Sequence, residues 1–280
     1  MLFRSGLVYR GAGAGNRSLQ QWIHSYRAAA SYITGAHAFK VGINERNGHT
    51  AFHSVALNPL LYRFNGGVPN QITQLAFPVD RLANMDHETG VYAQDKWTVG
   101  GLTLGYGLRY DYLATSYPEH HVGPAPLAPG RNITFPRVAN NAYHDITPKF
   151  GASYDPFGSG RTALKVSLNK YLTAISIVNN AFGADPNPVS NVVVSTTRSW
   201  NDANRNFVPD CNLLAAQANG ECGALDNPDF GSTRVGATYD PDTLSGWGKR
   251  DHNWQFYTSV QHQLLPRVSV DAGYYRTWFG

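Results

Sequence analysis

The stretch GVYAQDKWTVGGLTLGYGLRYDYL, residues 90–113, has the pattern of a long β-hairpin. Successive side chains of a strand point to opposite faces. From Leu102 to Tyr112 the chain alternates, with leucine or tyrosine at even positions and small or polar residues at odd ones. Soluble strands usually have about 5–6 residues, whereas a tilted transmembrane strand takes roughly 9–11. Tyr110 and Tyr112 end the apolar face, where an aromatic girdle would meet the lipid headgroups. This hairpin therefore predicts a membrane-spanning β-sheet.

The same alternation recurs along the chain, with short glycine- or proline-containing links between paired segments. Such links are ordinary hairpin signals. We expect four hairpins, at residues 26–45, 87–113, 146–173 and 252–279. The sequence thus predicts an all-β fold: a partial antiparallel transmembrane β-barrel of about eight strands.

Long segments separate the hairpins, at residues 46–86, 114–145 and 174–251. Structureless loops of this length are uncommon in compact soluble domains. Outer-membrane barrels have short periplasmic turns and long extracellular loops. The pattern therefore places the four short turns in the periplasm and the long loops outside the cell.

Composition agrees with a membrane barrel. Charged residues make up only 15% of the chain, against about 25% in soluble domains. No run of about 18 apolar residues occurs, so no transmembrane helix is expected. The net charge is +4 without a clustered basic stripe, so nucleic acid is not an expected partner. Nucleophile-elbow, Walker and H-E-x-x-H motifs are missing as well, so we expect no enzyme.

Polar residues on the second face of the strands are predicted to face the barrel lumen. They are Arg109, Asp111, Lys165, Gln261 and Asp271. Arg109 and Asp111 have two interpretations: they contact a plug or a solute, or they satisfy each other across the barrel wall.

The loop at residues 199–223 carries two further hypotheses. Cys211 and Cys222 are eleven residues apart, which in an exported protein suggests a local disulfide, the alternative being two free thiols. Oxygen-bearing side chains also alternate at Asp202, Asn204, Asn206 and Asp210. Calcium prefers several oxygen ligands, so a structural calcium site is one interpretation. Asp and Asn equally suit turns without a metal. No other cofactor is expected.

Several segments resemble the barrel domain of TonB-dependent outer-membrane receptors, in particular the Oar-like group with a carboxypeptidase-regulatory-like domain. The resemblance lies in SYITGAHAFKVG (31–42), LYRFNGGVPNQIT (61–73), the hairpin at 90–113, TPKFGASYDPFGSGRTALKVSLNKY (147–171) and VSVDAGYYRTWFG (268–280). The segments occur in the family's order and touch most of the chain. The loop at 199–223 is also similar to a loop of that group.

The resemblance implies a 22-stranded barrel in the bacterial outer membrane, filled by an N-terminal plug and energised by TonB. Such a receptor takes up a scarce nutrient, for example a siderophore, glycan or peptide. A signal peptide, a plug sequence and the C-terminal strands are not recognisable in these residues, so we expect an internal part of the barrel wall. The alternative is a non-transporting surface adhesion or scaffold β-barrel protein.

Overall fold

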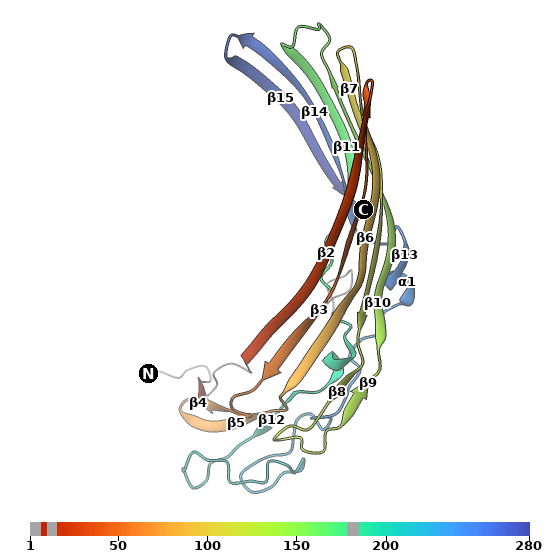
Figure 1. Ribbon diagram of the computed structural model, residues 1–280. Coiled ribbons are helices and arrows are strands. Elements are labelled where there is room, and N and C mark those ends of the chain that lie inside the picture. Colours follow the sequence, from red (N-terminus) through yellow and green to blue (C-terminus); the bar gives the residue numbers. More distant parts are fainter. Residues whose placement is uncertain (1–6, 10–15, 178–184) are drawn as a thin grey trace.

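Eight long strands form one curved antiparallel sheet in the computed structural model (Figure 1). The structure describes residues 7–9, 16–177 and 185–280, so residues 1–6, 10–15 and, in the last predicted loop, 178–184 lie outside it. The strand order is β15-β14-β11-β10-β7-β6-β3-β2. The bounds are β2 Asn16–Thr34, β3 His37–Val55, β6 Val79–Val99, β7 Leu102–Tyr117, β10 Val138–Tyr154, β11 Thr162–Leu172, β14 His252–Leu265 and β15 Val268–Phe279.

Four tight connections join these strands into hairpins, and their residues suit the backbone that each turn needs. Gly35 and Gly100 adopt positive φ in the first two turns. The third turn is longer and is held by Asp155, whose carboxylate accepts hydrogen bonds from the backbone N–H groups of Phe157 (3.2 Å) and Gly160 (2.7 Å). The fourth turn is Pro266-Arg267 rather than the predicted Leu265-Pro266, and Arg267 takes the left-handed conformation that glycine usually fills.

The strands run further than the alternation predicts, so several predicted boundaries are wrong. The first hairpin spans residues 16–55 instead of 26–45, and the loop predicted at 46–86 shrinks to 56–78 with a hairpin of its own. The loop predicted at 114–145 likewise shrinks to 118–137. Nineteen residues at roughly 3.3 Å each extend about 60 Å, well beyond the ~30 Å hydrocarbon core. Outside the membrane the strands continue to pair through backbone hydrogen bonds. Their side chains no longer need to alternate between apolar and polar, because no lipid faces them there.

The sheet is an open barrel wall. Strands β2 and β15 form its two edges, and they do not pair with each other among the described residues. A small strand, β13 (Ser245–Trp247), pairs in parallel with β10 beside the end of β11. The prediction of a partial antiparallel transmembrane barrel is confirmed. None of the helices in the described residues is long and apolar enough to cross a membrane.

The long connections fold together at one end of the wall instead of remaining structureless loops (Figure 1). We call residues 56–78, 118–137 and 185–235 the cap. Its elements are β4 (Leu60–Asn65), β5 (Val68–Leu75), β8 (His120–Val122), β9 (Ile133–Phe135), η1 (Pro188–Asn191) and β12 (Ser195–Ser199). Strand β1 (Leu7–Tyr9) pairs with β4, and the short helix α1 (Pro241–Leu244) precedes β13.

Two apolar clusters hold the cap. One contains Val79, Val122, Val189 and Val192, and the other joins Ile72 and Trp200 to the disulfide at Cys222. Each cluster draws residues from segments far apart in sequence, which is why no local periodicity marks it. At the opposite end of the wall lie the four tight turns.

Candidate functional site

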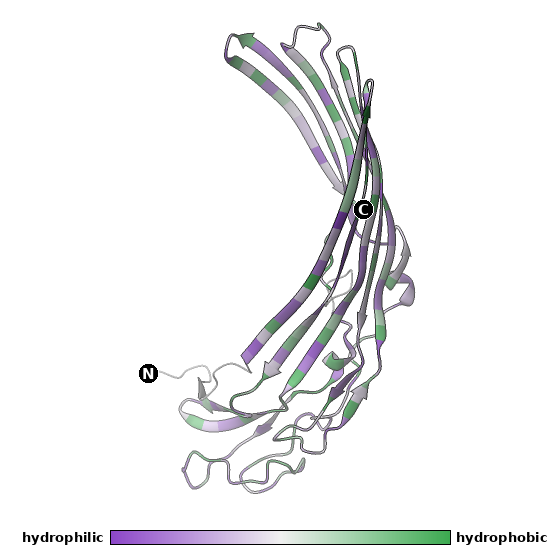
Figure 2. Cartoon of the chain, viewed as in Figure 1, coloured by the Kyte–Doolittle hydropathy of each residue, from purple (hydrophilic) through white to green (hydrophobic). Residues whose placement is uncertain are grey.

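The two faces of the wall differ in chemistry, as the alternating colours along the strands in Figure 2 show. Strand pairing places Arg109, Lys149 and Lys165 on one face, which we call the inner face. Leu108, Val166 and Val260 lie on the other, the outer face. The outer face matches the lipid-facing apolar band of outer-membrane barrels. The inner face is therefore the one that faces the barrel interior.

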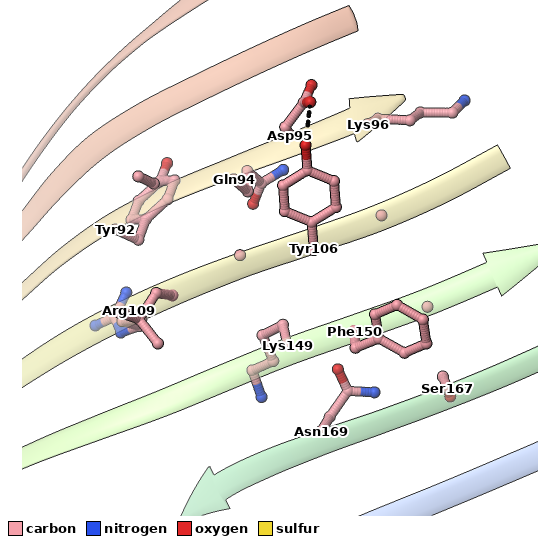
Figure 3. A pocket seen from close by; sticks show the side chains of 15 residues that line it. Tyr92, Gln94, Asp95, Lys96, Tyr106, Arg109, Lys149, Phe150, Ser167 and Asn169 are labelled. Atoms are coloured by element: carbon pink, nitrogen blue, oxygen red, sulfur yellow. Dashed lines mark hydrogen bonds between the residues drawn. The ribbon is translucent and has the colours of Figure 1, made fainter. Parts of the chain in front are cut away.

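The inner face is hollowed where β6, β7, β10 and β11 lie side by side (Figure 3). The hollow has a volume of about 610 Å³, within the roughly 300–1,000 Å³ typical of ligand sites. Its inner-face side chains are Tyr92, Gln94, Lys96, Arg109, Lys149, Ser167 and Asn169. Each of them bears a hydrogen-bond donor, so the hollow suits a polar solute.

Glycines make the floor of this hollow. Gly105 on β7 is directly opposite Gly151 on β10. A Cβ added at either position would meet only ordinary contacts, the nearest at 3.8 Å and 3.9 Å. Because glycine has no side chain, these two positions leave open space on the inner face, and no neighbouring side chain fills it.

Three cations border the hollow, and each is held differently. Arg109 donates from Nε to Asp111 Oδ1 at 2.7 Å. Lys149 donates from Nζ to the Lys170 carbonyl at 2.6 Å, and its Nζ lies 3.2 Å from the centre of the Tyr171 ring. Lys96 makes no ion pair among the described residues. The carboxylate of Asp95 lies on the outer face, so it does not neutralise these cations.

Gly90 determines where Arg109 can lie. A Cβ at Gly90 would overlap the Arg109 guanidinium. We therefore expect Gly90→Ala to displace the flexible end of Arg109 from Asp111 and to reduce the free energy of unfolding by about 1 kcal/mol, the value of a partly exposed ion pair. Urea-dependent unfolding of the full-length protein in vesicles measures this. Gly105→Ala, on the same face but facing open space, should change stability by less than about 0.5 kcal/mol.

A double variant checks the cause. Adding Arg109→Ala to Gly90→Ala removes the overlap, so the two losses should not add. Strict additivity would mean that the Gly90 effect does not come from contact with Arg109.

The part of the inner face nearer the cap has a second cavity, of about 320 Å³. Arg46 and Glu88 form an ion pair at 2.5 Å in its wall. Residues 174–177, at the start of the last long connection, cover it together with Arg250. The buried Arg250 donates from Nε to the Thr173 carbonyl at 2.9 Å, which fixes the two ends of that connection to each other. The connection thus begins by folding over the inner face.

The remaining residues that we predicted to face the lumen lie together on β11, β14 and β15. Lys165 donates from Nζ to Gln261 Oε1 at 2.8 Å, and Gln261 is directly opposite Asp271. For Arg109 and Asp111, the structure favours the interpretation in which they satisfy each other. Because both belong to β7, they do so along one strand and not across two.

The loop at residues 199–223 is ordered by its own side chains. A disulfide joins Cys211 to Cys222. Asp202 accepts hydrogen bonds from the backbone N–H groups of Asn206 (3.1 Å) and Phe207 (3.2 Å), as in Asx turns. Asp210 Oδ2 accepts from the side-chain amides of Asn204 (2.6 Å) and Asn206 (2.8 Å). The four predicted oxygen-bearing residues therefore lie close together, and their hydrogen bonds satisfy one another without a cation.

Glu221 joins this loop from the far side of the disulfide, and the sequence spacing did not suggest it. Its Oε1 accepts from Ala203 N–H at 2.8 Å, and its Oε2 from Asp210 N–H at 3.3 Å and the Trp200 indole at 3.4 Å. Partial burial raises the pKa of Glu221, but these hydrogen bonds outweigh that effect and hold its pKa below the ordinary value. In the described part of the chain, no three His, Cys, Asp or Glu side chains form a metal-binding group.

Calcium binding at this loop remains a prediction, because asparagine oxygens also bind calcium. We expect a chelator to increase protease cleavage within residues 199–223 of the wild type. It should add nothing to the cleavage of an Asp202→Ala variant. Asp240→Ala, outside the loop, is the matched control and should respond to the chelator like the wild type. If cleavage of the wild type is indifferent to the chelator, only the turn interpretation stands.

Two buried arginines in the cap were also missed by sequence reasoning. Arg131 donates to the carbonyls of Gly123 (2.6 Å), Ala76 (2.5 Å) and Pro78 (2.7 Å). Arg198 is fully buried and donates to four oxygen atoms. Burial lowers the pKa of both guanidinium groups. Single arginines inside polar loops carry no pattern that would mark them as buried.

The chain matches the model of the family described as outer membrane beta barrel domain over residues 4–277. It belongs to that family. The match covers nearly the whole sequence and places the protein in the bacterial outer membrane. No curated protein matches the chain. Membership agrees with the geometry: an antiparallel wall with an apolar outer face, a polar inner face, and tight turns and long connections at opposite ends.

Proposed function

We propose that this outer membrane beta barrel domain forms part of the barrel wall of a TonB-dependent receptor. Such a receptor imports a scarce nutrient, for example a siderophore, glycan or peptide. The observation that carries the proposal is the hollowed, donor-rich inner face of a wall whose edge strands, β2 and β15, do not pair with each other in the described part of the chain. Eight strands close only a small barrel, whose interior is filled by side chains. An open wall with a polar hollow suits a wider barrel with room for a plug and a solute.

In this proposal the 280 residues supply wall and outer loops, while TonB acts through the plug. The wall has no catalytic role. The segments at residues 90–113 and 147–171, which are similar to receptor barrels, support the assignment. They also form the four central strands that surround the hollow.

A specific observation favours the alternative of a surface adhesion or scaffold protein. Phe207 and Val208 are exposed in the loop at residues 199–223, where apolar side chains are available to a partner. The cap has apolar clusters and a disulfide of its own, as a binding module on a barrel would have.

Uptake in cells separates the two functions. Cells with and without the full-length protein would be given a panel of labelled siderophores, oligosaccharides and peptides, each in the presence and absence of TonB. The proposal expects at least one solute whose accumulation requires both proteins. Unchanged accumulation of the whole panel, together with lost surface attachment when the protein is deleted, would overturn it in favour of adhesion.

A further inference from the structure

We propose that the outer face carries a specific site for a phosphatidylethanolamine-type phospholipid. In this site an acyl chain lies in a groove along β6, and the headgroup is held by His37 at the end of the wall that carries the tight turns. The proposal does not depend on what crosses the barrel.

The groove exists because small side chains lie between larger ones. Ala93 on β6 is flanked by Val41 on β3 and Leu108 on β7. This part has a volume of about 420 Å³ and continues toward Phe39 and Tyr106. A second part, of about 690 Å³, shares the same three residues and continues to Ala28 and Ala30 on β2. The two parts therefore form one continuous apolar groove on the outer face, over β6 and the strands beside it.

Location identifies the occupant. The groove is on the face that meets the hydrocarbon region in an outer-membrane barrel. Only lipid is present there to fill it. The end with the tight turns is periplasmic in such barrels, so the lipid belongs to the inner leaflet.

A polar cluster lies at that end of the groove, where a headgroup would be. Asp95 is only 5% exposed although it is on the outer face. It accepts hydrogen bonds from the Tyr106 hydroxyl (2.8 Å) and the Ala38 N–H (3.1 Å), and His37 Nδ1 lies 2.6 Å from it. Figure 3 shows the bond from Tyr106 to Asp95. The carboxylate is thus fully occupied by the protein and is not itself the ligand site.

His37 is the group left for an outside partner. Its ring is parallel to those of Phe39 and Trp97, with interplanar angles of 4° and centroid distances of 5.3 Å and 5.7 Å. Nδ1 faces Asp95, so Nε2 is directed away from the carboxylate, and the His37 side chain is 37% exposed. A charged imidazole donates from Nε2, and a neutral one with its proton on Nδ1 accepts there. Phosphatidylethanolamine offers a phosphate for the first form and an ammonium for the second.

The test uses the full-length protein in nanodiscs and two spin-labelled probes with the same acyl chains. One probe is phosphatidylethanolamine, and the other is diacylglycerol, which lacks the headgroup. We expect the motionally restricted fraction to favour phosphatidylethanolamine by about fivefold, the effect of one hydrogen bond. His37→Leu should remove that preference while keeping the restricted diacylglycerol.

Filling the groove tests the acyl-chain part. Ala93→Phe should lower the restricted fraction of both probes. Ala152→Phe is the matched control, because Ala152 also lies on the outer face, opposite Leu104, but outside the groove. Equal restriction of both probes in the wild type would overturn the headgroup assignment. Equal effects of Ala93→Phe and Ala152→Phe would overturn the groove. His37→Leu keeps the outer face apolar, so it gives an answer even if Ala93→Phe does not fold.

Discussion

Leu108→Arg is expected to reduce the free energy of folding by about 2–4 kcal/mol, the cost of a cation near the middle of the lipid-facing band. Leu108 is on the outer face of β7, directly beside Ala93 on β6, which in turn lies beside Val41 on β3. The residue is 53% exposed. Leu108 is six residues from Leu102, where β7 begins at the tight turn, and four residues from Tyr112, which ends the alternating apolar face. An arginine there cannot easily reach water at either interface.

The measurement is urea-dependent folding of the full-length protein into vesicles. Gln94→Arg is the matched control because Gln94 is opposite Gly107, one residue from Leu108, but on the inner face. It adds the same charge to a polar surface, so its effect should stay below about 1 kcal/mol. Equal losses for both variants would mean that the assignment of the two faces is wrong.

The faces could be predicted because lipid imposes a simple rule on each strand. A residue on the outer face must be apolar within the bilayer whatever its neighbours are. The alternation from Leu102 to Tyr112 therefore predicts strand, direction and facing without any knowledge of the fold. The same alternation predicts that Arg109 and Asp111 share a face, and strand pairing puts them on the face of Lys149 and Lys165. The rule ends at the membrane surface, which is why the bounds of β3 and β6 were predicted too short.

The cap and the sites depend on contacts that no local pattern records. Gly105 and Gly151 form the floor of the hollow only because β7 and β10 pair in one particular register. Asp95 looks like one more polar residue in a strand, yet pairing places it on the outer face beside His37 of a different hairpin. Glu221 meets Asp210 only after the disulfide has closed the loop. These placements depend on the register between paired strands and on contacts between residues far apart in sequence. The alternation within a single strand records neither of them.

The cap should depend strongly on one buried cation, Arg198. It donates to the carbonyls of Gly223 (2.7 Å), Ala215 (3.1 Å) and Gln217 (2.9 Å), and to Gln74 Oε1 (3.3 Å). Arg198→Ala would leave these buried acceptors without their donor. We expect the cap to lose about 3–5 kcal/mol, the range for removing one partner of a buried charged contact. Residues 195–223 should then be cleaved much faster by protease.

The barrel wall should not share this loss, because Arg198 bonds only to cap residues among those the structure describes. Urea-dependent unfolding of the wall in vesicles should remain within about 0.5 kcal/mol of the wild type. Arg205→Ala is the matched control: Arg205 is exposed in the same loop, so its removal should leave the cleavage rate almost unchanged. If Arg198→Ala and Arg205→Ala were cleaved equally slowly, the four hydrogen bonds would not be what holds the cap. If Arg198→Ala destabilised the wall as well, the cap and the wall would be one cooperative unit, since independent units unfold at their own free energies.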